Sequence, residues 1–176
     1  AQESRGLGDV YKRQVTTDAN RKTIVNTYDA NYNKTSSTDA NGNKTWYSYT
    51  GNMKVNIVTL PDGNTVSYKY DGEDRVINVT DQNGSVTTTE YDDAGKVISV
   101  QDNDKNSVYY EYDAVGNIVK EIGKTGAVTS KTYDSAGNVL TVKDDNGNIT
   151  AHQYDNMNRV IKVTDALSGV TTYTYN

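Results

Sequence analysis

The chain has 176 residues and an uneven composition, with 15 Tyr and no Phe, 14 Gly and one Pro, and a single His. A hydrophobic share of 34% argues against a helical bundle, and no run of about 18 apolar residues could span a membrane as a helix. The net charge of −5 comes from scattered charges of both signs, without the basic patch that nucleic-acid binding requires.

Residues 1–14 form a leader that does not share the pattern of the rest of the chain. This leader lacks the apolar core segment of a signal peptide, and residues 9–14 resemble the translation of a transposase adaptor used in sequencing-library preparation. We therefore expect residues 1–14 to be an assembly artefact, with a genuine variable linker as the alternative.

From residue 15 to residue 176, tyrosine recurs every 21 residues without insertion or deletion, which predicts about eight tandem repeats. These ladder tyrosines are Tyr28, Tyr49, Tyr70, Tyr91, Tyr112, Tyr133, Tyr154 and Tyr175. Aspartate follows six of them, as Asp29, Asp71, Asp92, Asp113, Asp134 and Asp155. A second aspartate column contains Asp18, Asp39, Asp81, Asp102, Asp144 and Asp165. Glycine follows three residues later, as Gly42, Gly63, Gly84, Gly126 and Gly147.

Each repeat contains two short alternating segments separated by clusters of Asp, Asn and Gly. In one unit, residues 97–101 and 107–112 are rich in β-branched and aromatic residues with period two, which predicts strands. The clusters at 102–106 and 113–117 are turn-forming and too short for a crossover helix. The fold class is therefore predicted to be all-β, an antiparallel meander with two strands per repeat.

The alternation also predicts one apolar and one polar face. Ile77 and Val79 represent the apolar columns of the first strand, Asn78 and Ser99 represent the polar column between them, and a second tyrosine column stands two residues before the ladder. A single sheet cannot bury its apolar face alone, so we expect an open curved ribbon or part of a β-shell. Since the chain begins and ends inside repeats, we expect it to be a piece of a longer array.

The spacing Tyr91-Asp92-x-x-Gly95, followed by Asp102 and then Tyr112-Asp113-x-x-Gly116, resembles the YD repeat of Rhs proteins, wall-associated proteins and teneurins. The resemblance covers residues 15–176. It implies an antiparallel ribbon wound into a hollow shell, which in bacterial members encloses a C-terminal toxin and in animal members serves cell adhesion. It also implies a secreted or cell-surface location, with flanking repeats and a C-terminal toxin domain of the full-length parent as partners.

Catalysis is not expected, and neither is a cofactor. The aspartates recur with the period of the scaffold, whereas a catalytic pair is used once, so we interpret them as turn residues. His152 is the only histidine, and without Cys or a second His the chain offers neither a catalytic triad nor a zinc site. The repeat signature, namely the ladder tyrosines with the aspartates after them and the five glycines of the column, is predicted to be structural.

Two kinds of ligand remain as alternatives. The turns at residues 39–43 and 144–148 have the composition of calcium loops but lack the Gly and Glu spacing of an EF-hand, so no metal site is predicted. Tyrosine rings beside Asn, Asp and Thr could bind glycans, although cross-strand packing needs the same rings. We therefore predict a structural β-shell segment of a bacterial Rhs-type or wall-associated protein, whose parent encapsulates and helps to deliver a C-terminal toxin. A carbohydrate- or cell-surface-binding adhesin module is the alternative.

Overall fold

A computed structural model describes residues 12–17 and 22–176, and every regular element in these residues is a β-strand. The first eight strands are β1 (Lys12–Thr17), β2 (Thr23–Tyr28), β3 (Lys34–Thr38), β4 (Lys44–Tyr49), β5 (Val55–Thr59), β6 (Thr65–Tyr70), β7 (Val76–Thr80) and β8 (Val86–Tyr91). The others are β9 (Val97–Gln101), β10 (Ser107–Tyr112), β11 (Ile118–Ile122), β12 (Val128–Tyr133), β13 (Val139–Lys143), β14 (Ile149–Tyr154), β15 (Val160–Thr164) and β16 (Val170–Thr172).

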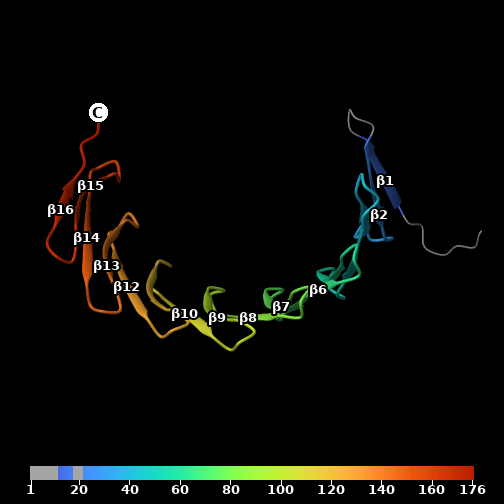
Figure 1. Ribbon diagram of the computed structural model, residues 1–176, viewed down its shortest axis with the longest axis horizontal. Helices are drawn as coiled ribbons and strands as arrows, with labels where there is room; N and C mark the ends of the chain where they lie inside the picture. The colour runs from blue at the N-terminus through green and yellow to red at the C-terminus, as the bar shows by residue number, and fades with distance from the viewer. Residues whose placement is uncertain (1–11, 18–21) are drawn as a thin grey trace, which may run out of the picture. The chain divides into compact units, whose positions relative to one another are not determined.

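The sixteen strands form one antiparallel sheet in which the order of the strands follows the order of the chain. Figure 1 shows consecutive strands joined by short hairpins, as a meander requires. The predicted segments 97–101 and 107–112 coincide with β9 and β10. The all-β meander with two strands per repeat is therefore confirmed.

The hairpins have a common backbone geometry. In each hairpin from residue 29 onward the first turn residue accepts a hydrogen bond from the residue three positions later, as in Gly42 N–H to Asp39 C=O at 3.1 Å. That later residue has a positive φ, for example 87° at Gly42. A type I turn followed by such a left-handed residue is a common three-residue hairpin loop. The glycine of the Asn41-Gly42 step thus occupies the left-handed position.

In six of the even-numbered strands that end at a ladder tyrosine, the pairing with the next odd-numbered strand shifts by one residue at this tyrosine. Between β4 and β5, Ser48 pairs with Ile57 but Tyr49 pairs with Val55, so β5 contributes one extra residue. The same shift occurs at Tyr28, Tyr70, Tyr112, Tyr133 and Tyr154. Such a β-bulge interrupts the hydrogen-bond ladder and increases the local twist of the strand.

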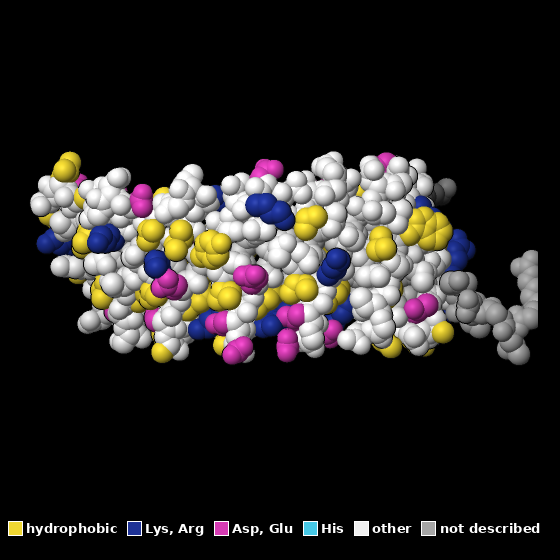
Figure 2. All heavy atoms as spheres, turned by 90° about the horizontal axis from the view of Figure 1, so that it is seen from below, with side chains coloured by type: hydrophobic (Ala, Val, Ile, Leu, Met, Phe, Trp, Pro, Cys, Tyr) yellow, Lys and Arg dark blue, Asp and Glu magenta, His cyan; other side chains and the backbone are white. Residues whose placement is uncertain are grey.

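No hydrophobic side chain among the described residues is buried, which is the expected result for a single layer of strands. Figure 2 accordingly shows hydrophobic side chains at the surface of the face in view. Of the two predicted apolar columns, that of Val58 and Val79 stands opposite the second tyrosine column, because Tyr47 pairs with Val58 and Tyr68 pairs with Val79, whereas Ile77 is the extra residue of a bulge. The apolar face is thus defined by the register although no second layer covers it within the described chain.

The polar face differs from the prediction at two serines. Ser36 and Ser99 are only 1% and 5% exposed, and they are the buried polar side chains of the described residues. Ser36 lies opposite Trp46, and Ser99 lies opposite Tyr109. An aromatic ring directly across the strand covers the small side chain, because opposite residues lie on one face about 5 Å apart.

The chain divides into two units, residues 1–88 and 89–176, with the boundary inside β8. Of the predicted leader, residues 1–11 lie outside the described residues, as does Asp18, while residues 12–14 belong to β1. None of the described residues forms a helix long and apolar enough to cross a membrane.

Candidate functional site

The ladder tyrosines make one contact repeatedly. The hydroxyl of Tyr70 donates a hydrogen bond to the backbone carbonyl of Val55, 15 residues earlier, at 2.7 Å. Five further ladder tyrosines bond to the carbonyl at the same spacing, namely Tyr49 to Lys34, Tyr112 to Val97, Tyr133 to Ile118, Tyr154 to Val139 and Tyr175 to Val160. Tyr28 instead donates to the side-chain oxygen of Gln14 at 3.0 Å.

This contact links the bulge of one repeat to the tyrosine of the next. Val55 is the bulge partner of Tyr49, and its carbonyl accepts the hydroxyl of Tyr70. A bulge leaves the ladder locally disrupted, and a buried carbonyl without a donor costs about 1–3 kcal/mol. The tyrosine hydroxyl therefore supplies a hydrogen-bond donor to the carbonyl at the bulge, where strand pairing is irregular. The same bond connects adjacent repeats.

The environment of these hydroxyls disfavours ionisation. Burial raises the pKa of Tyr49, Tyr70, Tyr112 and Tyr133 above the ordinary value of 10.0. Nearby Asp29 adds to the effect at Tyr49, and Asp113 does so at Tyr133. These tyrosines are thus held as neutral hydrogen-bond donors, which does not suit them to act as bases near neutral pH.

The aspartates that begin the turns cap the loop that follows. The Asp134 Oδ1 atom accepts the backbone N–H groups of Ala136 and Asn138, both at 2.9 Å, while Oδ2 accepts the Asn138 side-chain amide at 2.9 Å. Oδ1 atoms accept the same two backbone N–H groups in the turns that begin at Asp29, Asp39, Asp71, Asp81, Asp102, Asp113, Asp144, Asp155 and Asp165. This is the local bonding that makes aspartate a turn residue.

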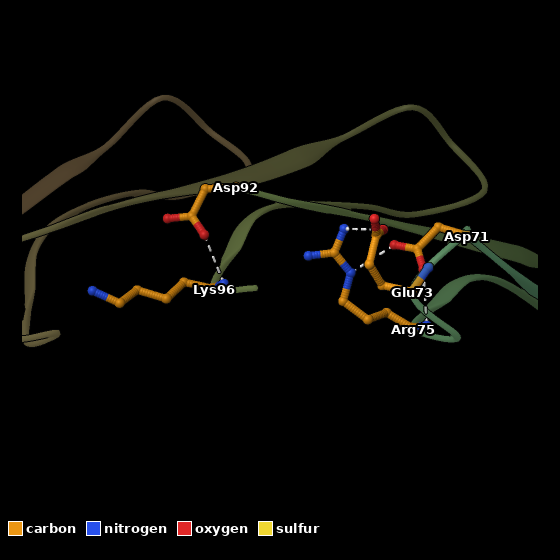
Figure 3. Close-up of polar contacts among 5 residues, drawn as sticks. All are labelled: Asp71, Glu73, Arg75, Asp92 and Lys96. Carbon is orange, nitrogen blue, oxygen red and sulfur yellow. Dashed lines mark hydrogen bonds and ion pairs between the residues drawn. The ribbon is translucent and has the colours of Figure 1, made fainter. Parts of the chain in front are cut away.

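In two turns an arginine replaces the asparagine at the fourth position after the aspartate. The Arg75 Nε atom donates to Asp71 Oδ2 at 2.6 Å and a terminal guanidinium nitrogen donates to Glu73 at 3.2 Å, as Figure 3 shows. Burial opposes ionisation of Asp71, but the hydrogen bonds from Arg75 outweigh it and lower its pKa. In the next equivalent turn, Figure 3 shows Asp92 contacting the backbone N–H of Lys96, at 2.8 Å.

The hydrogen bonds of the turns lower the pKa of several aspartates below the ordinary value of 3.8. At Asp134 the largest cause is the side-chain amide of Asn138, followed by its backbone N–H. The side-chain amide four residues later is also the largest cause at Asp29, Asp39, Asp113 and Asp144. These carboxylates are held ionised, so they are poor candidates for a general acid.

The column glycines occupy the left-handed positions of their turns. Gly42, Gly63, Gly84, Gly126 and Gly147 have φ between 81° and 88°. Lys105 and Ser168 adopt the same conformation with φ values of 67° and 66°. A residue with a Cβ pays a steric cost there, so glycine in this column is explained by backbone geometry.

Within the described residues, no group of three or more His, Asp or Glu side chains could hold a metal ion. The candidate calcium turns use their carboxylates internally, because Asp39 bonds both the backbone and the side-chain amide of Asn43. His152 stands in the second tyrosine column with its Nδ1 atom buried and without a hydrogen-bond partner. Its position opposite Val163 brings it no acidic partner for catalysis.

The bulge and the hydroxyl contact were not predicted from the sequence. One signal for them was present, since a column that contains Tyr in every repeat and never Phe indicates that the hydroxyl is used. The pairing of Ser36 and Ser99 with aromatic residues on the adjacent strand was also not predicted. Their signal is that Trp46 and Tyr109, three repeats apart in one column, each face a serine.

The sequence model of the family described as teneurin YD-shell matches residues 10–176. No significant match is found among curated proteins. The chain is similar to a structure of the Photorhabdus luminescens Tc holotoxin pore, with 19% identity, a TM-score of 0.68, and coverage of 82% of this chain and 9% of that one. For TcdB2-TccC3 without hypervariable C-terminal region, the identity is 18% and the TM-score is 0.69, over 85% of this chain and 10% of that one. At such identities the likeness establishes the fold, and the chain spans about a tenth of these relatives.

Proposed function

This chain belongs to the teneurin YD-shell family, and on that premise we propose that it is a structural segment of a protein shell. The observation that carries the proposal is the hydroxyl contact that joins six of the ladder tyrosines to a bulge carbonyl of the preceding repeat. In repeat proteins, stability is approximately the sum of the repeats and their nearest-neighbour interfaces. A contact that recurs with the repeat therefore suits a wall that is extended by adding units.

The ladder tyrosines, the aspartates after them and the column glycines act in this proposal as structural residues. Tyrosine joins neighbouring repeats, aspartate caps the turn, and glycine permits its left-handed residue. The division into a leader at residues 1–14 and about eight repeats at residues 15–176 belongs to the same proposal. The segment itself performs no catalysis and needs no cofactor.

We further propose that the full-length parent encloses a C-terminal toxin and acts outside the cell that makes it. Support comes from the fold shared with the Tc holotoxin pore and with TcdB2-TccC3, whose C-terminal region is described as hypervariable. The uncovered apolar and tyrosine-bearing face supports the same idea, since an exposed apolar surface of this kind marks a surface with a partner. The proposal is that this parent is a bacterial protein of the Rhs type or of the wall-associated type.

The test is protease protection in the full-length parent that contains this segment. A C-terminal tag reports whether the region after the repeats survives thermolysin. We expect it to be protected in the unaltered protein and digested when Tyr112, Tyr133 and Tyr154 are all changed to Phe, because the shell wall then loosens. The matched control is Tyr109→Phe, which removes the hydroxyl of a tyrosine that is 48% exposed and stands opposite Ser99. Equal digestion of the C-terminal region in all three proteins would contradict encapsulation.

The carbohydrate-binding alternative is separated by a second experiment. A glycan array probed with the purified chain is expected to give no saturable binding if the tyrosines serve only as scaffold. Saturable binding that survives the triple Phe substitution would instead favour an adhesin module.

A further inference from the structure

One hollow in the first unit is lined by several residues that differ from those at the same positions in other repeats. It has a volume of about 440 Å³ and lies between the turns at residues 50–54 and 71–75. The lining residues that matter here are Thr50, Asn52, Asn56, Tyr68, Tyr70 and Asp74.

Two of these residues depart from most other repeats, and a third, Asp74, places a carboxylate in a turn column that holds no other acidic residue. Thr50 follows a ladder tyrosine where six repeats have Asp, and Asn56 stands in a column that is Ile, Val or Leu in the next five repeats. Asp74 occupies a left-handed position, with φ of 63°, in a column that holds Gly95, Gly116 and Gly137 but also Tyr32, Met53 and Asn158. Positions that break a local rule together around one concavity are expected where a site has a function.

The carboxylate of Asp74 is loosely held. Its nearest partners are the side-chain amide of Asn52 at 3.4 Å and the Nζ atom of Lys54 at 3.7 Å. In the comparable pair between Lys124 and Asp102, the ammonium lies at 2.7 Å. Asp74 therefore retains room for a closer, charge-assisted hydrogen bond of about 2.7–2.9 Å.

Two aromatic rings from β6 line the same hollow. Tyr70 is fixed by its hydroxyl bond to the Val55 carbonyl at 2.7 Å, and Tyr68 is anchored in the register opposite Val79. Ring faces attract cations, and a carboxylate attracts them more strongly. Lys69 also lines the hollow, and Asp71 is already paired with Arg75 at 2.6 Å, so Asp74 is the more loosely paired carboxylate of the two.

We propose that this hollow binds a primary ammonium group on a chain about as long as a lysine side chain. Asp74 receives the ammonium, Asn52 offers its amide oxygen, and the rings of Tyr68 and Tyr70 contact the methylene chain. Lys54 is the internal competitor, because its own ammonium already approaches Asp74. The site does not depend on the shell function, since it uses only residues of one unit.

The experiment is an NMR titration of the ¹⁵N-labelled chain with cadaverine, with 1-pentanol as the neutral probe of similar length. We expect saturable shifts of the Asn52 and Asp74 amide signals, with a dissociation constant on the order of 1 mM, and none with 1-pentanol. A second arm uses Nα-acetyl-lysine amide. Binding of both amines identifies any accessible ammonium as the ligand, whereas binding of cadaverine alone identifies free diamines.

Two variants and a matched control make the test specific. Asp74→Gly restores the glycine of the following repeats and should weaken cadaverine binding at least about tenfold. Asn158→Gly makes the same kind of turn change in the second unit and should leave binding unaltered. Lys54→Met should tighten binding, because it removes the competitor. Equal affinity in the Asp74→Gly variant and the unaltered chain, or equal binding of 1-pentanol, would overturn the proposal.

Discussion

The hydroxyl of Tyr133, at the end of β12, donates to the carbonyl of Ile118, at the start of the neighbouring strand β11, at 2.7 Å. Ile118 is also the residue that pairs with Tyr112 at the preceding bulge. Ile118 thus meets two successive ladder tyrosines, because it pairs with the backbone of Tyr112 and accepts the hydroxyl of Tyr133.

The first prediction concerns this hydroxyl. Tyr133→Phe keeps the ring but leaves the Ile118 carbonyl without its donor, so the free energy of unfolding should fall by about 1–2 kcal/mol. Urea denaturation followed by circular dichroism measures the change. Tyr109→Phe is the control, since Tyr109 is 48% exposed, and it should alter stability by less than about 0.5 kcal/mol. A loss of the same size in both variants would show that the hydroxyl contact contributes nothing particular.

The second prediction is loss of stability in acid. The pKa values of several turn aspartates, among them Asp113, Asp134 and Asp144, are lowered from 3.8 in the folded chain. A carboxyl group with a lowered native pKa stabilises the fold above its unfolded pKa, and this contribution disappears as the pH falls through the native pKa. The urea midpoint should therefore be constant from pH 7 to about pH 5 and fall progressively below about pH 4.

A variant without the Asn138 side-chain amide serves as the control for this pH dependence. Asn138→Ala removes the largest cause of the lowered pKa at Asp134 and should make the acid loss smaller. An acid profile identical to that of the unaltered chain would rule out this hydrogen bond as a source of the pH dependence.

The third prediction concerns the left-handed turn positions. Lys105 has a φ of 67°, which costs a residue with a Cβ about 1–2 kcal/mol, partly offset by the greater chain entropy of glycine. Lys105→Gly should therefore raise the free energy of unfolding by about 0.5–1 kcal/mol. Gly126→Ala, at a φ of 85° in the same column, should lower it by about 1 kcal/mol. Thermal unfolding of both variants should show shifts of opposite sign.

The fourth prediction restores a missing cap. Gly123 stands where most repeats have an aspartate, its φ is not in the left-handed region, and a Cβ there would meet only the Ala127 carbonyl oxygen at 3.6 Å. Gly123→Asp should supply an oxygen for the backbone N–H groups of the turn and stabilise the chain by about 1 kcal/mol more than Gly123→Ala does. Equal midpoints for the two variants would show that the cap adds no stability here.

Much of the fold could be predicted because the repeat makes each local signal visible many times. The strands at residues 97–101 and 107–112, and the turns after Asp102 and Asp113, follow from alternation and from turn-forming side chains. These are local effects, set by residues within a few positions of one another.

The bulges could not be predicted, because they depend on how two neighbouring strands pair. No residue type in the sequence marks the register shift between Glu111 and Tyr112. This shift nevertheless determines which backbone carbonyl the hydroxyl of the next ladder tyrosine reaches. The burial of Ser99 has the same origin, since this serine lies opposite Tyr109 on one adjacent strand and donates its hydroxyl to Glu90 on the other at 2.7 Å. The hollow beside Asp74 likewise exists only because two turns 21 residues apart lie on the same edge of the sheet.

The spacing of 15 residues between donor tyrosine and acceptor carbonyl has a consequence for the history of such genes. If recombination removes or duplicates a stretch equal to one repeat, the new junction again places a tyrosine 15 residues after an equivalent carbonyl. Every hydroxyl then finds its acceptor without any compensating mutation. Arrays of this design can change length by whole repeats, whereas a deletion that is not a whole number of repeats disturbs this spacing at the junction.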